Sequence, residues 1–257
     1  SLVSDLRHET TGKTRSESSS ALCPEHGTPV TIDTLQVCGR TFQNVSGCEE
    51  CDQIALRAEK RHEEERRAAA FVNAQRIAEI PLRYRSATLR PFPLTAPGQK
   101  EVLAHANAFV SAAGKNGPGL VLVGKVGSGK TYLACAILNA FLQTGLNGQF
   151  LTVMQTMRRI KDTWAKDSEK SEQQAIRTLI APDLLILDEV GVQLGTDFEH
   201  LYLSEIVNGR YNAMRPTILI SNLTMPEFTT LVGERVVDRF REGGTVLVFD
   251  WPSLRHR

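Results

Sequence analysis

The sequence has no excess of either charge. Lys and Arg number 30 and Asp and Glu number 29, so the formal net charge is only +1. This balance excludes a uniformly basic nucleic-acid coat protein, and any contact with DNA must come from a local patch. Long apolar runs are also missing. No stretch approaches the ~20 residues that a membrane-spanning helix needs, so we expect no membrane association.

Cysteine is scarce. The chain has five cysteines, an odd number, and four of them fall between residues 21 and 51. This uneven distribution argues against a disulfide framework and for a reduced compartment. The N-terminal residues are too polar for a secretory signal, so we expect a cytoplasmic protein. The hydrophobic fraction of 41% is that of an ordinary globular chain.

Composition divides the chain into four segments. Residues 1–20 are rich in Ser and Thr and poor in large apolar groups, which predicts a disordered tail. Residues 21–51 hold the cysteine cluster. Residues 52–80 contain no Gly or Pro and balance acids against bases, which predicts an exposed connector helix with ion pairs, ended by Pro81. Residues 81–257 form the remaining, largest segment.

The largest segment alternates short apolar runs with helical patterns. This alternation predicts an α/β fold in which helices cover both faces of a parallel sheet. The expected strands are GLVLVG at 119–124, QFLTV at 149–153, DLLILDE at 183–189, TILISNL at 217–223 and TVLVFDW at 245–251.

A phosphate-binding loop is the strongest motif. The run GKVGSGKT fits the pattern GxxxxGK[ST] and lies between a strand pattern and a helix pattern. Glycines let successive backbone amides point at phosphate oxygens, at a helix N-terminus that also favours anions. Lys130 is expected to reach the β- and γ-phosphates and Thr131 to ligate Mg²⁺. The nucleotide-binding candidates are Gly124, Val126, Gly127, Ser128, Gly129, Lys130 and Thr131.

Two carboxylates end the apolar run at 184–187. Asp188 and Glu189 would lie at the carboxyl end of an interior strand, where ligands bind in open α/β sheets. We expect Asp188 to hold Mg²⁺, directly or through water, and Glu189 to activate the attacking water. A pair of acids favours hydrolysis over binding alone.

Further polar candidates follow the next strand. Asn222 could contact the γ-phosphate or the attacking water, or it could be a turn residue or helix N-cap; Ser221 is the neighbouring option. Arg235 and Arg239 lie four residues apart on one side of a predicted helix. They could form a solvated face or present a guanidinium to the γ-phosphate in a neighbouring subunit.

The cysteine cluster has the spacing of a zinc site. The pairs Cys23-x2-His26 and Cys48-x2-Cys51 lie in a segment with few large apolar groups, which needs a stabilising metal to fold. We therefore predict Zn²⁺ bound by these four residues. Cys38 is a spare thiol that could replace His26.

The motif set resembles a known family. GKVGSGKTYLACAI, LLILDEVGVQ, TILISNL and LVGERVVDRF, in this order, resemble AAA+ helicase loaders of the DnaC type and the related DnaI loaders and IstB transposition ATPases. The resemblance covers about residues 80–257 and implies ATP as the nucleotide, a five-stranded parallel sheet and no helical lid. It implies Asn222 as sensor 1, Arg235 as arginine finger, Arg239 as a second phosphate-sensing arginine and Arg255 as a further nucleotide contact.

The same resemblance gives a role to the insertion after the second strand. Its basic residues could contact single-stranded DNA or form a solvated face, and they are Arg158, Arg159, Lys161 and Lys166. Trp164 is expected to pack with an apolar stripe. Some of these loaders carry an N-terminal zinc module that contacts the replicative helicase.

These features together predict an ATPase that loads a replicative hexameric helicase of the DnaB type onto single-stranded DNA. Self-association through AAA+ interfaces follows from the expected role of Arg235. Two alternatives remain: an IstB-like ATPase that regulates a transposase, and a zinc and DNA adaptor that does not hydrolyse its nucleotide.

Overall fold

The computed structural model describes residues 15–37, 40–90, 92, 94–112, 119–192 and 197–255. The chain divides into two units, Ser1–Ala68 and Ala69–Arg257, and each is described by itself. Cys38 and the first 14 residues lie outside the described residues.

The first unit contains a three-stranded antiparallel sheet. Its strands β1 (Arg15–Leu22), β2 (Pro29–Val37) and β3 (Arg40–Ser46) pair in chain order. Residues 15–20, which we expected in a disordered tail, therefore belong to β1. Composition misleads here because polar side chains can bond across strands: Ser18 opposes Asp33 and donates a hydrogen bond of 2.6 Å to its carboxylate.

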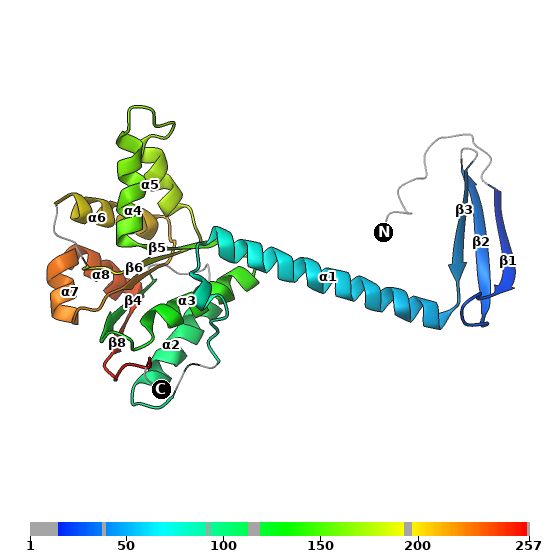
Figure 1. The fold of residues 1–257 in the computed structure, drawn as a ribbon, viewed down its shortest axis with the longest axis horizontal. Coiled ribbons are helices and arrows are strands. Elements are labelled where there is room, and N and C mark those ends of the chain that lie inside the picture. The colour runs from blue at the N-terminus through cyan, green and yellow to red at the C-terminus, as the bar shows by residue number, and fades with distance from the viewer. Residues whose placement is uncertain are drawn as a thin grey trace. The chain divides into compact units, whose positions relative to one another are not determined.

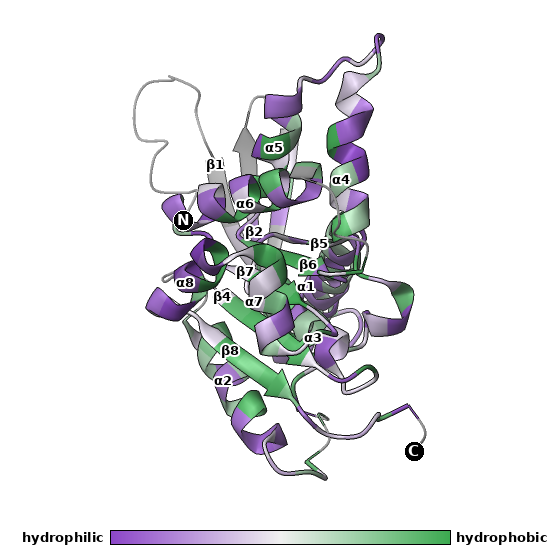
Figure 2. Cartoon of the chain, turned by 90° about the vertical axis from the view of Figure 1, so that its left-hand side faces the viewer, coloured by the Kyte–Doolittle hydropathy of each residue, from purple (hydrophilic) through white to green (hydrophobic). Residues whose placement is uncertain are grey.

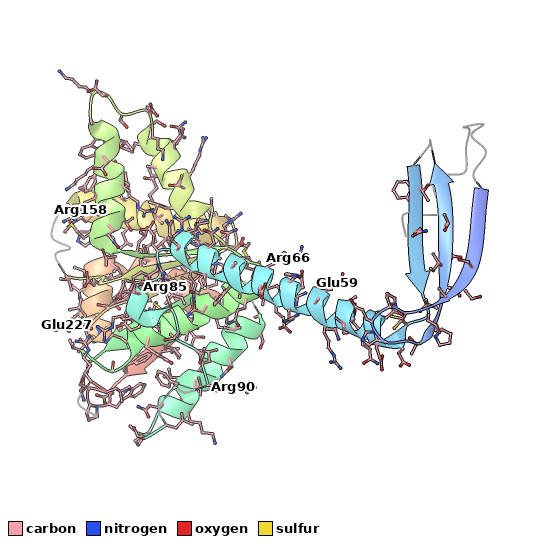
Figure 3. All side chains as sticks on the ribbon, turned by 45° about the vertical axis from the view of Figure 1, so that its right-hand side comes forward. Glu59, Arg66, Arg85, Arg90, Arg158 and Glu227 are labelled. Carbon is pink, nitrogen blue, oxygen red and sulfur yellow. The ribbon has the colours of Figure 1, made fainter. Side chains whose placement is uncertain are left out.

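The helix α1 (Glu49–Ile77) begins three residues before the predicted connector and ends three residues before its predicted end. Acidic residues in its first turn complement the helix dipole. Its middle part is exposed, and the predicted ion pairs are present, for example Glu63 with Arg67 at 2.8 Å. Figure 3 shows Glu59 and Arg66 projecting from this part of the helix. Glu79, with a positive φ of 58°, turns the chain away after the last turn.

The second unit is built on a five-stranded parallel sheet, which confirms the predicted α/β fold. Its strand order is β5-β6-β7-β4-β8. The strands are mainly apolar (Figure 2), as expected for a sheet covered on both faces. Their bounds are β4 (Gly119–Gly124), β5 (Gly148–Thr152), β6 (Leu184–Asp188), β7 (Thr217–Ile220) and β8 (Thr245–Phe249).

Alternate residues of each strand enter two separate cores. On one face, Leu120 and Leu122 pack with helices α2 (Gln99–Ser111) and α3 (Lys130–Gln143). On the other face, Val121 and Val123 pack with the remaining helices. These are α4 (Val153–Lys161), α5 (Glu172–Ile180), α6 (Asp197–Asn212), α7 (Met225–Val232) and α8 (Glu234–Gly243). The result is a sheet between two helical layers.

The strand order brings the sequence motifs together. β7 lies between β4, which leads into the phosphate-binding loop, and β6, which ends in Asp188. Because the strands are parallel, their carboxyl ends share one edge of the sheet.

The insertion after β5 forms a helical hairpin. It consists of α4, the short 3-10 helix η2 (Asp162–Trp164) and α5, and α4 and α5 extend side by side away from the sheet (Figure 1). A second 3-10 helix, η1 (Leu82–Tyr84), follows α1. In the described part of the chain, no helix is both long enough and apolar enough to cross a membrane.

Candidate functional site

A cavity of about 450 Å³ lies at the carboxyl edge of the sheet. This volume is within the range of small-ligand and cofactor sites. The walls come from the phosphate-binding loop, the ends of β6 and β7, the η1 segment and the C-terminal tail. The lining residues are Arg83, Tyr84, Phe92, Val126, Gly127, Gly129, Lys130, Thr131, Tyr132, Asp188, Glu189, Ile220, Asn222, Leu254 and Arg255.

The phosphate-binding loop follows β4 and leads directly into α3, as the motif predicts. Gly127 has a φ of 76°, and a Cβ there would lie 2.2 Å from the Ser253 hydroxyl, so only glycine fits. Lys130 is 5% exposed, and its ammonium donates to the carbonyls of Gly124 and Lys125 at 2.7 and 2.6 Å. Burial lowers the pKa of Lys130 to about 8. A phosphate beside this buried cation would stabilise its charge.

Thr131 and Asp188 meet across the cavity. The Thr131 hydroxyl donates to the Asp188 carboxylate at 2.9 Å. Two adjacent ligands of an octahedral magnesium ion, each at ~2.1 Å, lie ~3.0 Å apart, so these oxygens fit that ion. Burial raises the pKa of Asp188, partly offset by the hydrogen bond from the Glu189 amide. A dication would relieve this desolvation cost.

Glu189 and Asn222 complete the phosphate end of the cavity. Glu189 has a φ of 61°, a conformation rare for a side-chain-bearing residue, and this turn leaves its carboxylate exposed at the cavity wall. Asn222 also lines the cavity. It is not the N-cap of α7, because Thr224 occupies that position. Ser221 faces elsewhere: it is buried, and its hydroxyl donates to the Val190 carbonyl at 2.6 Å.

Three aromatic residues also line the cavity, and we call this part of its lining the aromatic end. The sequence motifs assign none of them to the site. Tyr84, Phe92 and Tyr132 line it together with Arg83, whose guanidinium lies 5.0 Å from the centre of the Tyr84 ring. Aromatic faces stack on nucleotide bases. The family resemblance begins at about residue 80 and so includes Arg83 and Tyr84, but no local sequence pattern indicates that this segment reaches the phosphate-binding loop.

The C-terminal tail braces the same loop. The Trp251 indole donates to the Ser128 carbonyl at 2.8 Å, and the Leu254 amide donates to the Gly127 carbonyl at 2.9 Å. This course brings Arg255 to the cavity wall, where its charge further lowers the pKa of Lys130 after the larger effect of burial. Together with Arg83, three cationic side chains thus line one cavity, which favours the binding of a polyanion.

The two arginines of α8 do not line this cavity. Arg235 is exposed, and Arg239 is half-buried with its guanidinium 4.4 Å from the centre of the Tyr211 ring. Neither arginine lies on the face of α8 that packs Val236 and Val237 into the core. Arg235 therefore lies outside the cavity of its own chain.

The α4–α5 hairpin combines cations with exposed aromatic groups. Arg158 is exposed and projects from α4 (Figure 3). Lys161 lies 4.8 Å from the centre of the Phe198 ring, and Trp164, which is 55% exposed, packs edge-on against that ring at 5.1 Å. Trp164 is therefore less buried than the predicted apolar stripe. Arg159 differs from its neighbours because it forms an ion pair with Glu79.

In the first unit, the four predicted zinc ligands come together. Cys23 and His26 lie in the turn after β1, and Cys48 and Cys51 lie at the start of α1. Their ligand atoms all lie within 4.8 Å of one another. The Sγ atoms of Cys23 and Cys51 are 3.6 Å apart, and His26 Nδ1 lies 3.4–3.6 Å from the three sulfurs.

These distances fit a tetrahedral ion. With zinc–sulfur bonds of ~2.3 Å and a zinc–nitrogen bond of ~2.0 Å, ligand atoms lie ~3.5–3.8 Å apart. The Thr28 hydroxyl lowers the pKa of Cys48 to about 6, whereas hydrogen bonding to Cys48 raises the pKa of Cys51 to about 12. Crowded thiols of this kind lose their protons together only when a cation binds. The described apolar core of this unit is small, centred on Cys23, Val30 and Cys48.

Comparisons with known proteins identify the family. A model of the IstB-like ATP binding proteins matches residues 40–240. The replicative helicase loader DnaC of Escherichia coli (strain K12) is 34% identical over 201 residues, which are 74% of this chain and 82% of that protein. DnaC of Buchnera aphidicola subsp. Baizongia pistaciae is 31% identical over 175 residues, 68% of this chain and 71% of that protein.

Solved structures agree with this result. The crystal structure of the DnaC helicase loader superposes with a TM-score of 0.59 and 27% identity, over 66% of this chain and all of that one. The structure of DnaI, at 23% identity and a TM-score of 0.57, covers 68% of this chain and 94% of that one and supports the fold alone. The chain therefore belongs to the DnaC/DnaI/IstB-like family of AAA+ ATPases.

Proposed function

We propose that this protein is an ATP-dependent loader that delivers a replicative hexameric helicase of the DnaB type onto single-stranded DNA. The observation that carries the proposal is the contact between Thr131, at the start of α3, and Asp188, at the end of β6. It joins a phosphate-binding loop to an acidic pair within one cavity, in a chain related to the helicase loader DnaC.

In this proposal the phosphate end of the cavity binds and hydrolyses ATP. The backbone amides of Gly127 and Gly129 and the Lys130 ammonium would hold the phosphates. Thr131 and Asp188 would hold Mg²⁺, which would neutralise negative charge on the phosphates. Glu189 accepts a proton from the attacking water, and Asn222 orients that water or the γ-phosphate. The aromatic end receives the base, and Arg255 adds a cation to the triphosphate.

Self-association would complete the site. Arg235 is exposed on α8 and away from its own cavity. A guanidinium supplied by a neighbouring subunit stabilises the charge of the transition state, an effect worth about 10³–10⁵ in rate in other nucleotidases. Arg239, stacked on Tyr211, would support the same interface.

The other proposed contacts lie outside the cavity. The first unit, with zinc held by Cys23, His26, Cys48 and Cys51, would bind the helicase. Arg158 and Lys161 on the α4–α5 hairpin would contact the phosphates of single-stranded DNA, and the exposed Trp164 face offers a stacking surface for a base.

One set of measurements tests this function. Glu189→Gln should leave ATP affinity within about threefold of the unchanged protein but reduce turnover by 10²-fold or more, on the order expected for loss of a catalytic base. Glu169→Gln, the same substitution at an exposed residue 20 positions before Glu189, is the matched control. The helicase should form a complex with the unchanged protein and be recruited to single-stranded DNA in an ATP-dependent manner.

The two alternatives give different results in the same assays. A regulator of a transposase would form filaments on duplex DNA and leave the helicase unbound. A non-hydrolysing adaptor would show the same ATP turnover before and after Glu189→Gln.

A further inference from the structure

The last turns of α1 contain a buried amide. All residues of α1 are described, and Gln75 alone among them is buried, with 3% of its surface exposed. Its Nε2 donates to the Arg85 carbonyl at 2.7 Å and to the Asn139 side-chain oxygen at 2.8 Å. An apolar side chain would pack here without desolvating polar atoms, so the amide indicates a requirement for these particular partners.

Asn139 extends this network to the wall of the cavity. It lies on α3, is 2% exposed, and its Nδ2 donates to the carbonyls of Tyr84, Arg85 and Ala87 at 3.2, 3.3 and 2.9 Å. One side chain thus holds the turn after η1 in place. Because Tyr84 lines the aromatic end of the cavity, the position of that wall depends on Asn139. Figure 3 shows Arg85 beside the end of α1.

Helix α3, which contains Asn139, also contains Lys130 and Thr131 of the phosphate-binding loop. α3 begins at Lys130 and reaches Asn139 within nine residues, a rise of ~13.5 Å along a rigid rod. The end of α1 has further attachments to the ATPase unit. The Ala78 carbonyl accepts a hydrogen bond of 2.8 Å from the Phe150 amide at the sheet edge, and Glu79 pairs with Arg159 on α4.

We propose that Gln75 and Asn139 are a positioning pair that couples two events. The first is docking of the last turns of α1, and the second is closure of the Tyr84 segment on the nucleotide base. The inference rests on ATP binding in the proposed cavity. By thermodynamic reciprocity, a base that stabilises the Tyr84 segment also stabilises docked α1, and undocking of α1 weakens nucleotide binding.

The first test changes the amide in the full-length chain. Gln75→Met keeps length and helix propensity but removes both hydrogen bonds. It should weaken ATP and ADP binding about tenfold and leave the binding of magnesium tripolyphosphate, which has no base, within about twofold. Gln143→Met, the same change at the exposed end of α3, is the matched control and should alter neither. Equal losses for ATP and tripolyphosphate would mean a general structural role and overturn the inference, as would unchanged ATP affinity.

The second test needs no variant, so it holds even if Gln75→Met fails to fold. In the unchanged chain, ATP should slow amide hydrogen exchange across residues 72–87, whereas tripolyphosphate should not. Exchange there that is insensitive to ATP, in protein that binds ATP, overturns the inference and leaves the proposed function standing. Failure of the unchanged chain to bind ATP refutes the proposed function itself.

Discussion

Trp251 offers a direct test of how the C-terminal tail supports the phosphate-binding loop. The side chain is 4% exposed, its ring centre lies 4.8 Å from that of Phe249, and its indole donates to the Ser128 carbonyl at 2.8 Å. Trp251→Phe keeps an aromatic ring in the same pocket but removes the donor. The Ser128 carbonyl then loses its partner in a site that excludes water.

The structure sets the size of the effect. A buried carbonyl left without a donor costs about 1–3 kcal/mol, and the smaller ring buries less apolar surface, which costs about 1 kcal/mol. The free energy of unfolding should therefore fall by about 2–4 kcal/mol. Because the orphaned carbonyl lies within the loop that binds phosphate, part of this cost falls on the nucleotide complex, and the Kd for ATP should rise about 5–10-fold.

Urea unfolding followed by circular dichroism gives the first quantity, and titration calorimetry gives the second. Trp164→Phe is the matched control. It makes the same substitution at a tryptophan that is 55% exposed and bonded to Glu172 at the surface, so it should change stability by less than about 0.5 kcal/mol. If Trp251→Phe lowers stability as expected but leaves ATP affinity unchanged, the tail supports the fold and not the loop.

Three further predictions follow from the site. The pKa of Lys130 is lowered to about 8 in the free protein, so above that pH the ammonium loses its proton and ATP binding must take one up. Calorimetry should therefore show the affinity for ATP falling as pH rises from 8 to 10. An affinity that does not change over this range contradicts the assignment of Lys130. His26→Ala should reduce bound zinc, measured by mass spectrometry, while the exposed His62→Ala should not, and equal zinc content in both rules out His26 as a ligand. Arg235→Ala should preserve ATP binding but abolish turnover, and mixing it with inactive Glu189→Gln should restore activity through mixed interfaces; no recovery argues against a role between subunits.

The local motifs could be predicted from the sequence because each is a short segment with its own conformational requirement. The alternation of apolar runs and helical patterns predicted all five strands of the parallel sheet, with bounds that differ by only a few residues. GKVGSGKT needs nothing beyond its glycines and the strand and helix beside it to form an anion-binding loop. The two short metal-ligand pairs were recognised for the same reason, since a spacing of two residues brings both ligands to one turn.

The errors have equally local causes. Residues 15–20 were expected in a tail because Ser and Thr dominate them, yet strand pairing with β2 supplies backbone hydrogen bonds that composition does not reveal. Trp164 was assigned to an apolar stripe; it packs against Phe198 but is 55% exposed, because it lies in the 3-10 helix that follows the end of α4.

The sequence by itself determined the phosphate-binding loop, the strands of the parallel sheet and the two short Cys and His pairs, because these depend on residues close together in the chain. The tertiary structure alone decided which aromatic residues line the cavity, how the tail braces the loop and how the end of α1 is attached. The bond between Gln75 and Asn139 joins residues 64 apart, and that between Trp251 and Ser128 joins residues 123 apart. The buried Arg210, which donates to the backbone carbonyls of Ile180, Pro182 and Pro216, is a third case. Contacts of this kind leave no periodic signal, because they arise only when the sheet brings distant segments into one core.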